Sequence, residues 1–119
     1  MRPHEKLDVW KKAVEFVITI YKNTKNFPTE EKYGLTSQIR RAAVSIPANI
    51  AEGSARQTTK EFLNFLSIAQ GSSSELETEL LIAQKLGYLN QENYDELKNE
   101  VEIIGRMMIG LSNHLRQKL

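Results

Sequence analysis

Cysteine is absent from the 119-residue sequence, which excludes disulfides, thiolate metal sites and cysteine nucleophiles. Histidine occurs only as His4 and His114, and neither lies in the Glu-x-x-His motif that is typical of metal-binding helical bundles. The serines of "GSSSE" have no histidine base nearby, so a hydrolase triad is unsupported. Glu75 and Glu79 could act as an acid and a base, but carboxylates at this spacing more often pair with arginine. We therefore predict a non-enzyme with no catalytic residues, no metal site and no cofactor.

Long apolar runs are also missing. The longest stretch without charge, "FLNFLSIAQGSSS", has 13 residues and is half polar, whereas a membrane-spanning helix needs about 20 mostly apolar residues. The start, "MRPHEKLDVWKK", lacks the apolar core of a signal peptide. These features predict a soluble cytoplasmic protein without a membrane partner.

Four segments show the spacing of apolar residues that is typical of amphipathic helices, at about 6–25, 35–53, 59–86 and from 91 onward. Pro28 and Gly34 separate the first two segments, Thr58 and Glu61 form a capping box before the third, and Gly87 ends it. Strand-like alternation is absent. The sequence predicts one all-α domain over 1–119, an antiparallel up-down-up-down left-handed four-helix bundle.

Apolar stripes predict which side of each helix faces the core. In the first segment the stripe is Leu7, Trp10, Val14, Val17 and Tyr21. In the second it is Leu35, Ile39, Ala42, Ala43, Ile46 and Ile50. In the third it is Phe62, Phe65, Leu66, Ala69, Ser73, Leu76, Leu80 and Ala83, and in the fourth it is Tyr94, Leu97, Val101, Ile104, Met108, Leu111 and Leu115. The first segment carries further apolar residues outside its stripe, namely Val9, Phe16, Ile18 and Ile20. One four-helix core cannot easily bury all of them, which favours association with another copy of the chain.

Polar residues follow the edges of two of these stripes. In the second segment, "SIPANIAEG" places an amide, a carboxylate and a proline beside the apolar arc. We predict an inter-helix polar seam in which Arg40 or Arg41 pairs with Glu75 or Glu79. The remaining members of the predicted seam are Ser45, Asn49, Glu52 and Ser72. Such a seam would fix the register of the helices. Two alternatives are a surface for a partner and, less favoured, a small-molecule site.

The net charge of +1 conceals an asymmetry, because residues 1–60 carry +5 and residues 61–119 carry −4. Antiparallel helices would place these halves side by side, so part of the asymmetry should cancel. A nucleic-acid surface is the alternative. Beside Arg40 and Arg41, its candidate residues are Lys11, Lys12, Lys22, Lys25, Arg56 and Lys60.

The order of residues resembles the 23S rRNA intervening-sequence protein family, whose members are also called four helix bundle proteins. The most specific matching blocks are "FP..E..GLTSQIRRAAVSIPANIAEG" and "FL..A.GS..ELET", and the resemblance covers nearly the whole chain. It implies a four-helix bundle that forms a ring-like homopentamer. It also implies similarity to the accessory protein of diversity-generating retroelements, a pentameric barrel that works with a reverse transcriptase and nucleic acid.

Two hypotheses about function follow. The first is a non-enzymatic homo-oligomeric bundle that binds RNA or DNA, or that scaffolds a nucleic-acid enzyme. The second is a purely structural or protein-interaction bundle that has no role with nucleic acid.

Overall fold

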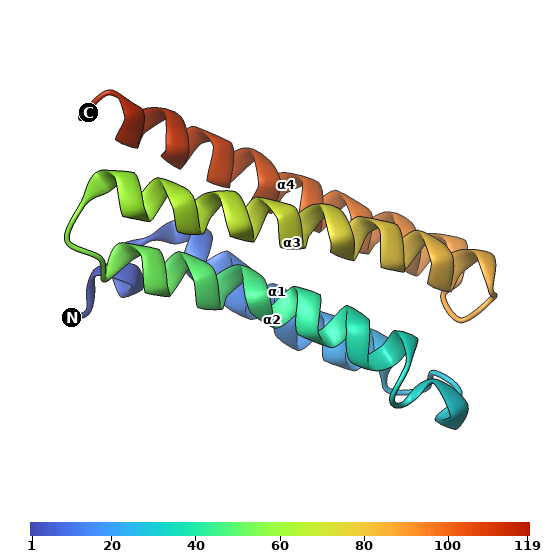
Figure 1. The fold of residues 1–119 in the computed structure, drawn as a ribbon. Helices are drawn as coiled ribbons and strands as arrows, with labels where there is room; N and C mark the ends of the chain where they lie inside the picture. Colours follow the sequence, from blue (N-terminus) through green and yellow to red (C-terminus); the bar gives the residue numbers. More distant parts are fainter.

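The computed structural model describes residues 1–119 and contains four long helices and no strand. The helices are α1 (Asp8–Thr24), α2 (Leu35–Ser54), α3 (Thr59–Lys85) and α4 (Gln91–Arg116). Two short 3-10 helices, η1 (Pro3–Lys6) and η2 (Thr29–Glu31), precede α1 and α2. Successive helices run in opposite directions, as the sequence predicts, and the bundle measures 46 × 22 × 21 Å (Figure 1).

Local signals in the sequence explain where the helices begin and end. The Thr58 hydroxyl accepts a hydrogen bond from the Glu61 backbone N–H at 3.1 Å, and the Asn90 side chain accepts one from the Asn93 N–H at 2.7 Å. Gly87 has a φ of +82°, the left-handed conformation that stops α3. These caps and the glycine hold the two turns that connect α2 to α3 and α3 to α4.

The core consists of 22 buried apolar residues contributed mainly by the four helices. All six residues of the predicted α2 stripe are buried, and so are most of the residues predicted for α3 and α4. Those in α3 are Leu66, Ala69, Leu76, Leu80 and Ala83, and those in α4 are Leu97, Val101, Ile104, Met108 and Leu115. Periodicity therefore predicts the buried side of three helices correctly.

In α1 the predicted stripe is only partly correct, because Leu7, Trp10 and Val17 are half-buried against the core but do not form its centre. The residues buried there are Val9, Ala13, Phe16, Ile20 and Thr24, whereas Val14 and Tyr21 are 36% and 42% exposed. Because α1 is apolar around most of its circumference, its pattern does not identify the inner side. The packing of α1 between α2 and α4 determines its inner side, on which Phe16 and Ile20 are buried.

Neighbouring helices pack as pairs around the bundle, α1 with α2, α2 with α3, α3 with α4, and α4 with α1. Both chain termini lie at the end of the bundle that also carries the turn between α2 and α3 (Figure 1). No helix combines the length and the apolar character needed to cross a membrane.

Candidate functional site

A short chain of polar contacts joins α2 to α3. The hydroxyl oxygens of Ser45 and Ser72 lie 2.8 Å apart, across the two helices. The side-chain amide of Asn49 donates to the Ser45 carbonyl at 2.8 Å and to the Ser45 hydroxyl at 2.9 Å. Since the Ser45 oxygen accepts from Asn49, its own hydrogen is available for Ser72. All three side chains are half-buried, so the sequence-predicted residues Ser45, Asn49 and Ser72 are brought together.

The predicted ion pair between Arg40 or Arg41 and Glu75 or Glu79 does not form in this chain. The two ion pairs present are Lys12–Glu100 and Glu52–Arg56. Successive residues on a helix point about 100° apart. Arg40 accordingly turns toward α1, where its Nε donates to the Thr24 hydroxyl at 2.9 Å.

Arg40 and Arg41 therefore have different surroundings. The Arg40 guanidinium lies 4.4 Å from the centre of the Tyr21 ring, a cation–π contact between α2 and α1. Arg41 is exposed and lines a shallow groove of about 310 Å³ with Glu75, Ser45 and Ser72. In this groove Arg41 and Glu75 face the same open space without contact, so both charges are available to another molecule.

Glu79, which the sequence predicts for the seam, is buried without a basic partner. Only 5% of it is exposed, and its Oε1 has no hydrogen-bond partner. Burial is the largest cause that raises the pKa of Glu79, and together with a hydrogen bond with Glu75 and the repulsion of the Glu75 charge it brings this pKa to about 7. No arginine compensates for this burial. With a pKa of about 7, Glu79 is therefore only partly ionised at neutral pH.

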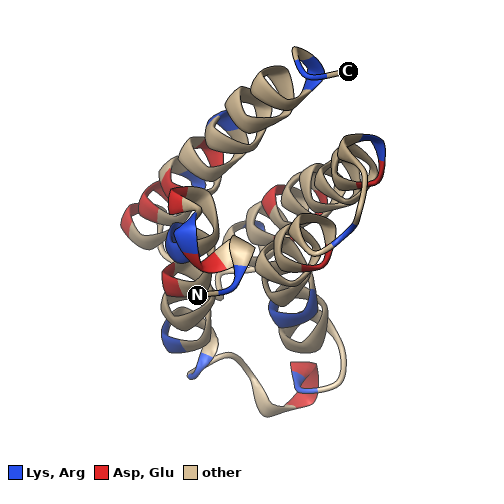
Figure 2. Cartoon of the chain, turned by 90° about the vertical axis from the view of Figure 1, so that its left-hand side faces the viewer, with Lys and Arg blue, Asp and Glu red and all other residues tan.

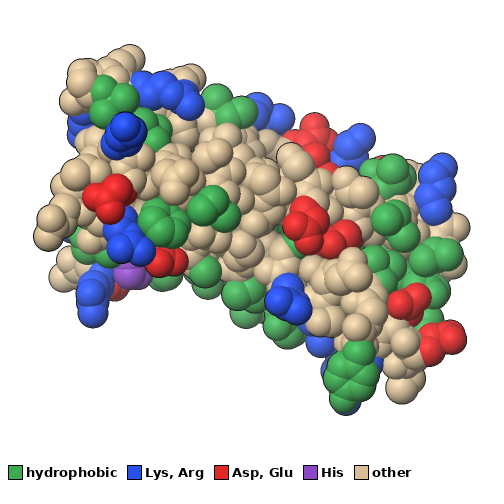
Figure 3. Space-filling view, in the orientation of Figure 1, with side chains coloured by type: hydrophobic (Ala, Val, Ile, Leu, Met, Phe, Trp, Pro, Cys, Tyr) green, Lys and Arg blue, Asp and Glu red, His purple; other side chains and the backbone are tan.

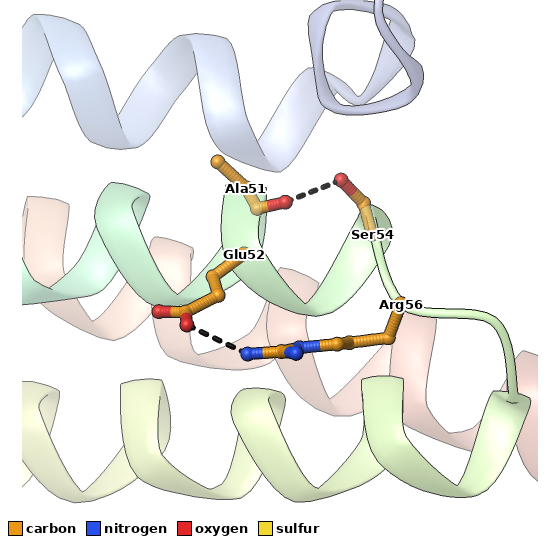
Figure 4. Close-up of polar contacts among 4 residues, drawn as sticks. All are labelled: Ala51, Glu52, Ser54 and Arg56. Atoms are coloured by element: carbon orange, nitrogen blue, oxygen red, sulfur yellow. Dashed lines mark hydrogen bonds and ion pairs between the residues drawn. The ribbon is translucent and has the colours of Figure 1, made fainter.

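Glu52, which the sequence places in the seam, pairs instead with Arg56 at the end of α2. Arg56 Nη2 lies 2.8 Å from Glu52 Oε1, and the Ser54 hydroxyl donates to the Ala51 carbonyl at 2.8 Å (Figure 4). The Arg56 guanidinium also lies 4.8 Å from the centre of the Phe65 ring on α3. Arg56 thus closes the turn between α2 and α3 and is only partly available for phosphate.

The basic residues that the sequence predicts for nucleic acid lie at two ends of the bundle. Lys11, Lys12, Arg56 and Lys60 lie toward the end that carries both chain termini, whereas Lys22 and Lys25 lie toward the other end. Lys12 forms an ion pair with Glu100, in which Lys12 Nζ lies 3.1 Å from Glu100 Oε2. The predicted set therefore does not form one surface.

Sequence reasoning missed a different asymmetry, which runs along the bundle. The end with both termini comprises residues 1–12, 50–64 and 106–119, and Figure 2 looks onto this end. These residues include nine Lys or Arg and four Asp or Glu, a net charge of +5. The rest of the chain has seven Lys or Arg and eleven Asp or Glu, a net charge of −4. We call residues 1–12, 50–64 and 106–119 the basic end.

The seam yields a prediction about stability. Asn49→Ala removes two short hydrogen bonds at a half-buried position and should lower the free energy of unfolding by about 1–2 kcal/mol, a decrease in Tm of roughly 5 °C. Asn99→Ala, at an exposed position of α4, and Lys12→Ala, in a partly exposed ion pair, should each change it by less than about 0.5 kcal/mol. Thermal denaturation followed by circular dichroism measures all three. Equal, small effects would show that the seam does not stabilise the bundle.

The fold and the seam define an antiparallel four-helix bundle protein in which no three His, Cys, Asp or Glu side chains are grouped to hold a metal ion. Residues 5–110 match the sequence model of the 23S rRNA-intervening sequence protein family, and the chain belongs to this family. It is similar to the crystal structure of a protein with unknown function, from the S23 ribosomal protein family of Bacteroides thetaiotaomicron VPI-5482. The two share 30% identity over 87% of this chain and 97% of that one, with a TM-score of 0.79. No curated protein matches the chain.

Proposed function

We propose that the protein is a non-enzymatic bundle that assembles with copies of itself and binds RNA through the basic end. RNA binding is inferred from the net charge of +5 on the basic end, residues 1–12, 50–64 and 106–119. Within this region residues 106–119 contain no carboxylate side chain, and Lys11 and Lys60 are exposed and form no ion pair. Such a cluster attracts a polyphosphate backbone and releases its counterions.

The same proposal agrees with what the sequence resemblance implies, a similarity to the accessory protein of diversity-generating retroelements, which works with nucleic acid. Assembly would strengthen binding, because copies packed side by side in one direction place their basic ends on one side. Each copy then adds phosphate contacts at a high effective concentration. The family description, with its reference to rRNA, makes RNA the first polymer to test.

A matched pair of variants tests the role of the basic end. We expect Lys11→Ala/Lys60→Ala to weaken binding of a fluorescent RNA hairpin and to reduce the slope of log Kd against log salt by about two. Lys22→Ala/Lys25→Ala removes the same charge at the opposite end and should leave the slope unchanged. Fluorescence anisotropy over a series of salt concentrations measures both.

Three results would contradict parts of this proposal. Absence of binding at low salt would exclude a role with RNA and favour the alternative, a bundle that binds a protein partner. Equal weakening by both double variants would exclude the basic end as the site. Equal affinity for a DNA hairpin of the same sequence would show that the phosphate backbone, rather than RNA, is recognised.

A further inference from the structure

Four exposed apolar side chains lie together on the side formed by α1 and α2. Val14, Ile18 and Tyr21 follow one another on α1 at steps of four and three residues, so they share one side of that helix. Tyr21 and Val44 of α2 line a common shallow groove of about 390 Å³. Ile18 is 54% exposed and Val44 is 41% exposed. We call Val14, Ile18, Tyr21 and Val44 the α1–α2 patch.

A second exposed apolar stripe runs along α3. Ile68 and Ile82 are 45% and 44% exposed, and Glu75 lies midway between them at steps of seven residues. Such a step keeps side chains on one side of a helix over several turns, as in coiled-coil packing. Gly71 and Ser72 lie beside them and leave room for close approach. We call Ile68, Glu75 and Ile82 the α3 stripe. Figure 3 shows the side on which α2 and α3 lie in front; its centre carries mainly uncharged polar groups and backbone.

The charges around these two surfaces are opposite. Arg40 and Arg41 line the groove of the α1–α2 patch, whose lining includes no carboxylate. The α3 helix has no Lys or Arg between Lys60 and Lys85, so Glu75 is not offset by a neighbour on its own helix. Arg41 and Glu75 are both exposed and take part in no ion pair within the chain. The α1–α2 patch is therefore bordered by positive charge, and the α3 stripe carries the negative charge of Glu75.

The relative positions of the α1–α2 patch and the α3 stripe determine whether contacts between copies form a closed ring. The α1–α2 patch and the α3 stripe lie on neighbouring sides of the bundle, because α2 contacts both α1 and α3. A contact between two different surfaces of identical copies is heterologous, and it closes into a ring when each copy is rotated relative to the last. Neighbouring sides of a four-helix bundle provide such a rotation.

We propose that the α1–α2 patch of one copy binds the α3 stripe of the next copy, with Arg41 of the first paired to Glu75 of the second. This inference rests on the self-assembly proposed above and names its interface. Ile68 and Ile82 pack against Val14, Ile18, Tyr21 and Val44, which removes these side chains from water. The bundles lie side by side, so their basic ends gather on one face of the ring.

Charge reversal at Arg41 and Glu75, first singly and then together in one chain, tests this interface. Arg41→Glu alone places two carboxylates at the contact, and Glu75→Arg alone places two guanidinium groups there. We expect each variant to elute at the monomer mass of 13.6 kDa in size-exclusion chromatography with light scattering. The double reversal Arg41→Glu/Glu75→Arg in one chain should regain the mass of the wild-type assembly, because unlike charges then meet at every contact, whatever the number of copies in the ring.

The controls separate the interface from the assembly itself. Lys98→Glu and Glu102→Arg reverse exposed charges on α4 outside both surfaces and should assemble as the wild type does. Ile68→Ser changes no charge and should also yield a monomer, with its helical circular dichroism intact. A monomeric wild type would overturn the proposed assembly. A wild-type assembly that persists in Arg41→Glu and Glu75→Arg would overturn this interface alone, and a double reversal Arg41→Glu/Glu75→Arg that stays monomeric would overturn the Arg41–Glu75 contact.

Discussion

Glu79→Gln is expected to raise Tm at pH 8 by roughly 10 °C and to remove most of the pH dependence of stability around neutrality. The pKa of Glu79 rises from 4.5 to about 7 on folding, so the folded state binds a proton more tightly than the unfolded chain. Its stability is therefore complete below pH 4.5, falls as pH rises to about 7, and stays low above that value. The difference corresponds to about 3 kcal/mol at pH 8. Glutamine keeps the shape of the side chain and cannot ionise.

The groups that face Glu79 determine how this prediction is controlled. Glu75 on the same helix is the charged group that raises its pKa. On α2, Arg40 is held by Thr24 and Tyr21 of α1, and Arg41 forms no ion pair in the chain. Glu77→Gln removes a carboxylate from the side of α3 that lines a different groove, against α4, and serves as the matched control. Denaturation between pH 5 and pH 8 should show a falling Tm for wild type and Glu77→Gln, and a nearly flat one for Glu79→Gln. An equally steep fall in Glu79→Gln would exclude Glu79 as the titrating group.

The sequence predicts the seam residues better than their pairing. Ser45, Asn49 and Ser72 could be expected to meet because they lie along the edges of two apolar stripes. The partners of the arginines could not, because a rotation of one residue on α2 decides whether Arg40 faces α1 or α3. The Thr24 hydroxyl and the Tyr21 ring attract Arg40 to the α1 side, and neither signal is visible until the helices are placed.

The error in α1 and the missed basic end also arise because a pattern along the sequence does not show which residues are neighbours in space. Residues such as Val14 and Phe16 are both apolar, so periodicity alone cannot show which of them α2 and α4 enclose. Charge counted along the sequence contrasts the two halves, whereas the antiparallel fold brings residues 1–12, 50–64 and 106–119 to one end. The predicted up-down-up-down order already allows charge to be counted along the axis of the bundle, and that count, rather than a count along the sequence, identifies the basic end.

Gly53 shows a further consequence of the packing of α2 against α3, and its replacement is predicted to be costly. A Cβ at this position would lie 2.7 Å from Phe65 Cβ and 2.9 Å from Phe62 Cδ1, with the Phe62 carbonyl at 3.3 Å. Phe65 Cβ and the carbonyl cannot move without α3 itself, so Gly53→Ala must push the two helices apart. Overpacking of this kind costs about 3 kcal/mol, and alanine regains only about 1 kcal/mol through its higher helix propensity.

The net expectation for Gly53→Ala is therefore a loss of about 2 kcal/mol, or roughly 8 °C in Tm. Gly110→Ala makes the same chemical change on α4, where a Cβ would meet nothing within 4 Å. It should gain up to about 1 kcal/mol. Opposite signs for the two alanines, measured by thermal denaturation, would show that contact with Phe62 and Phe65 rather than backbone flexibility requires glycine at position 53. A stabilised Gly53→Ala would contradict the close approach of α2 and α3, because only a looser interface could accept the methyl group.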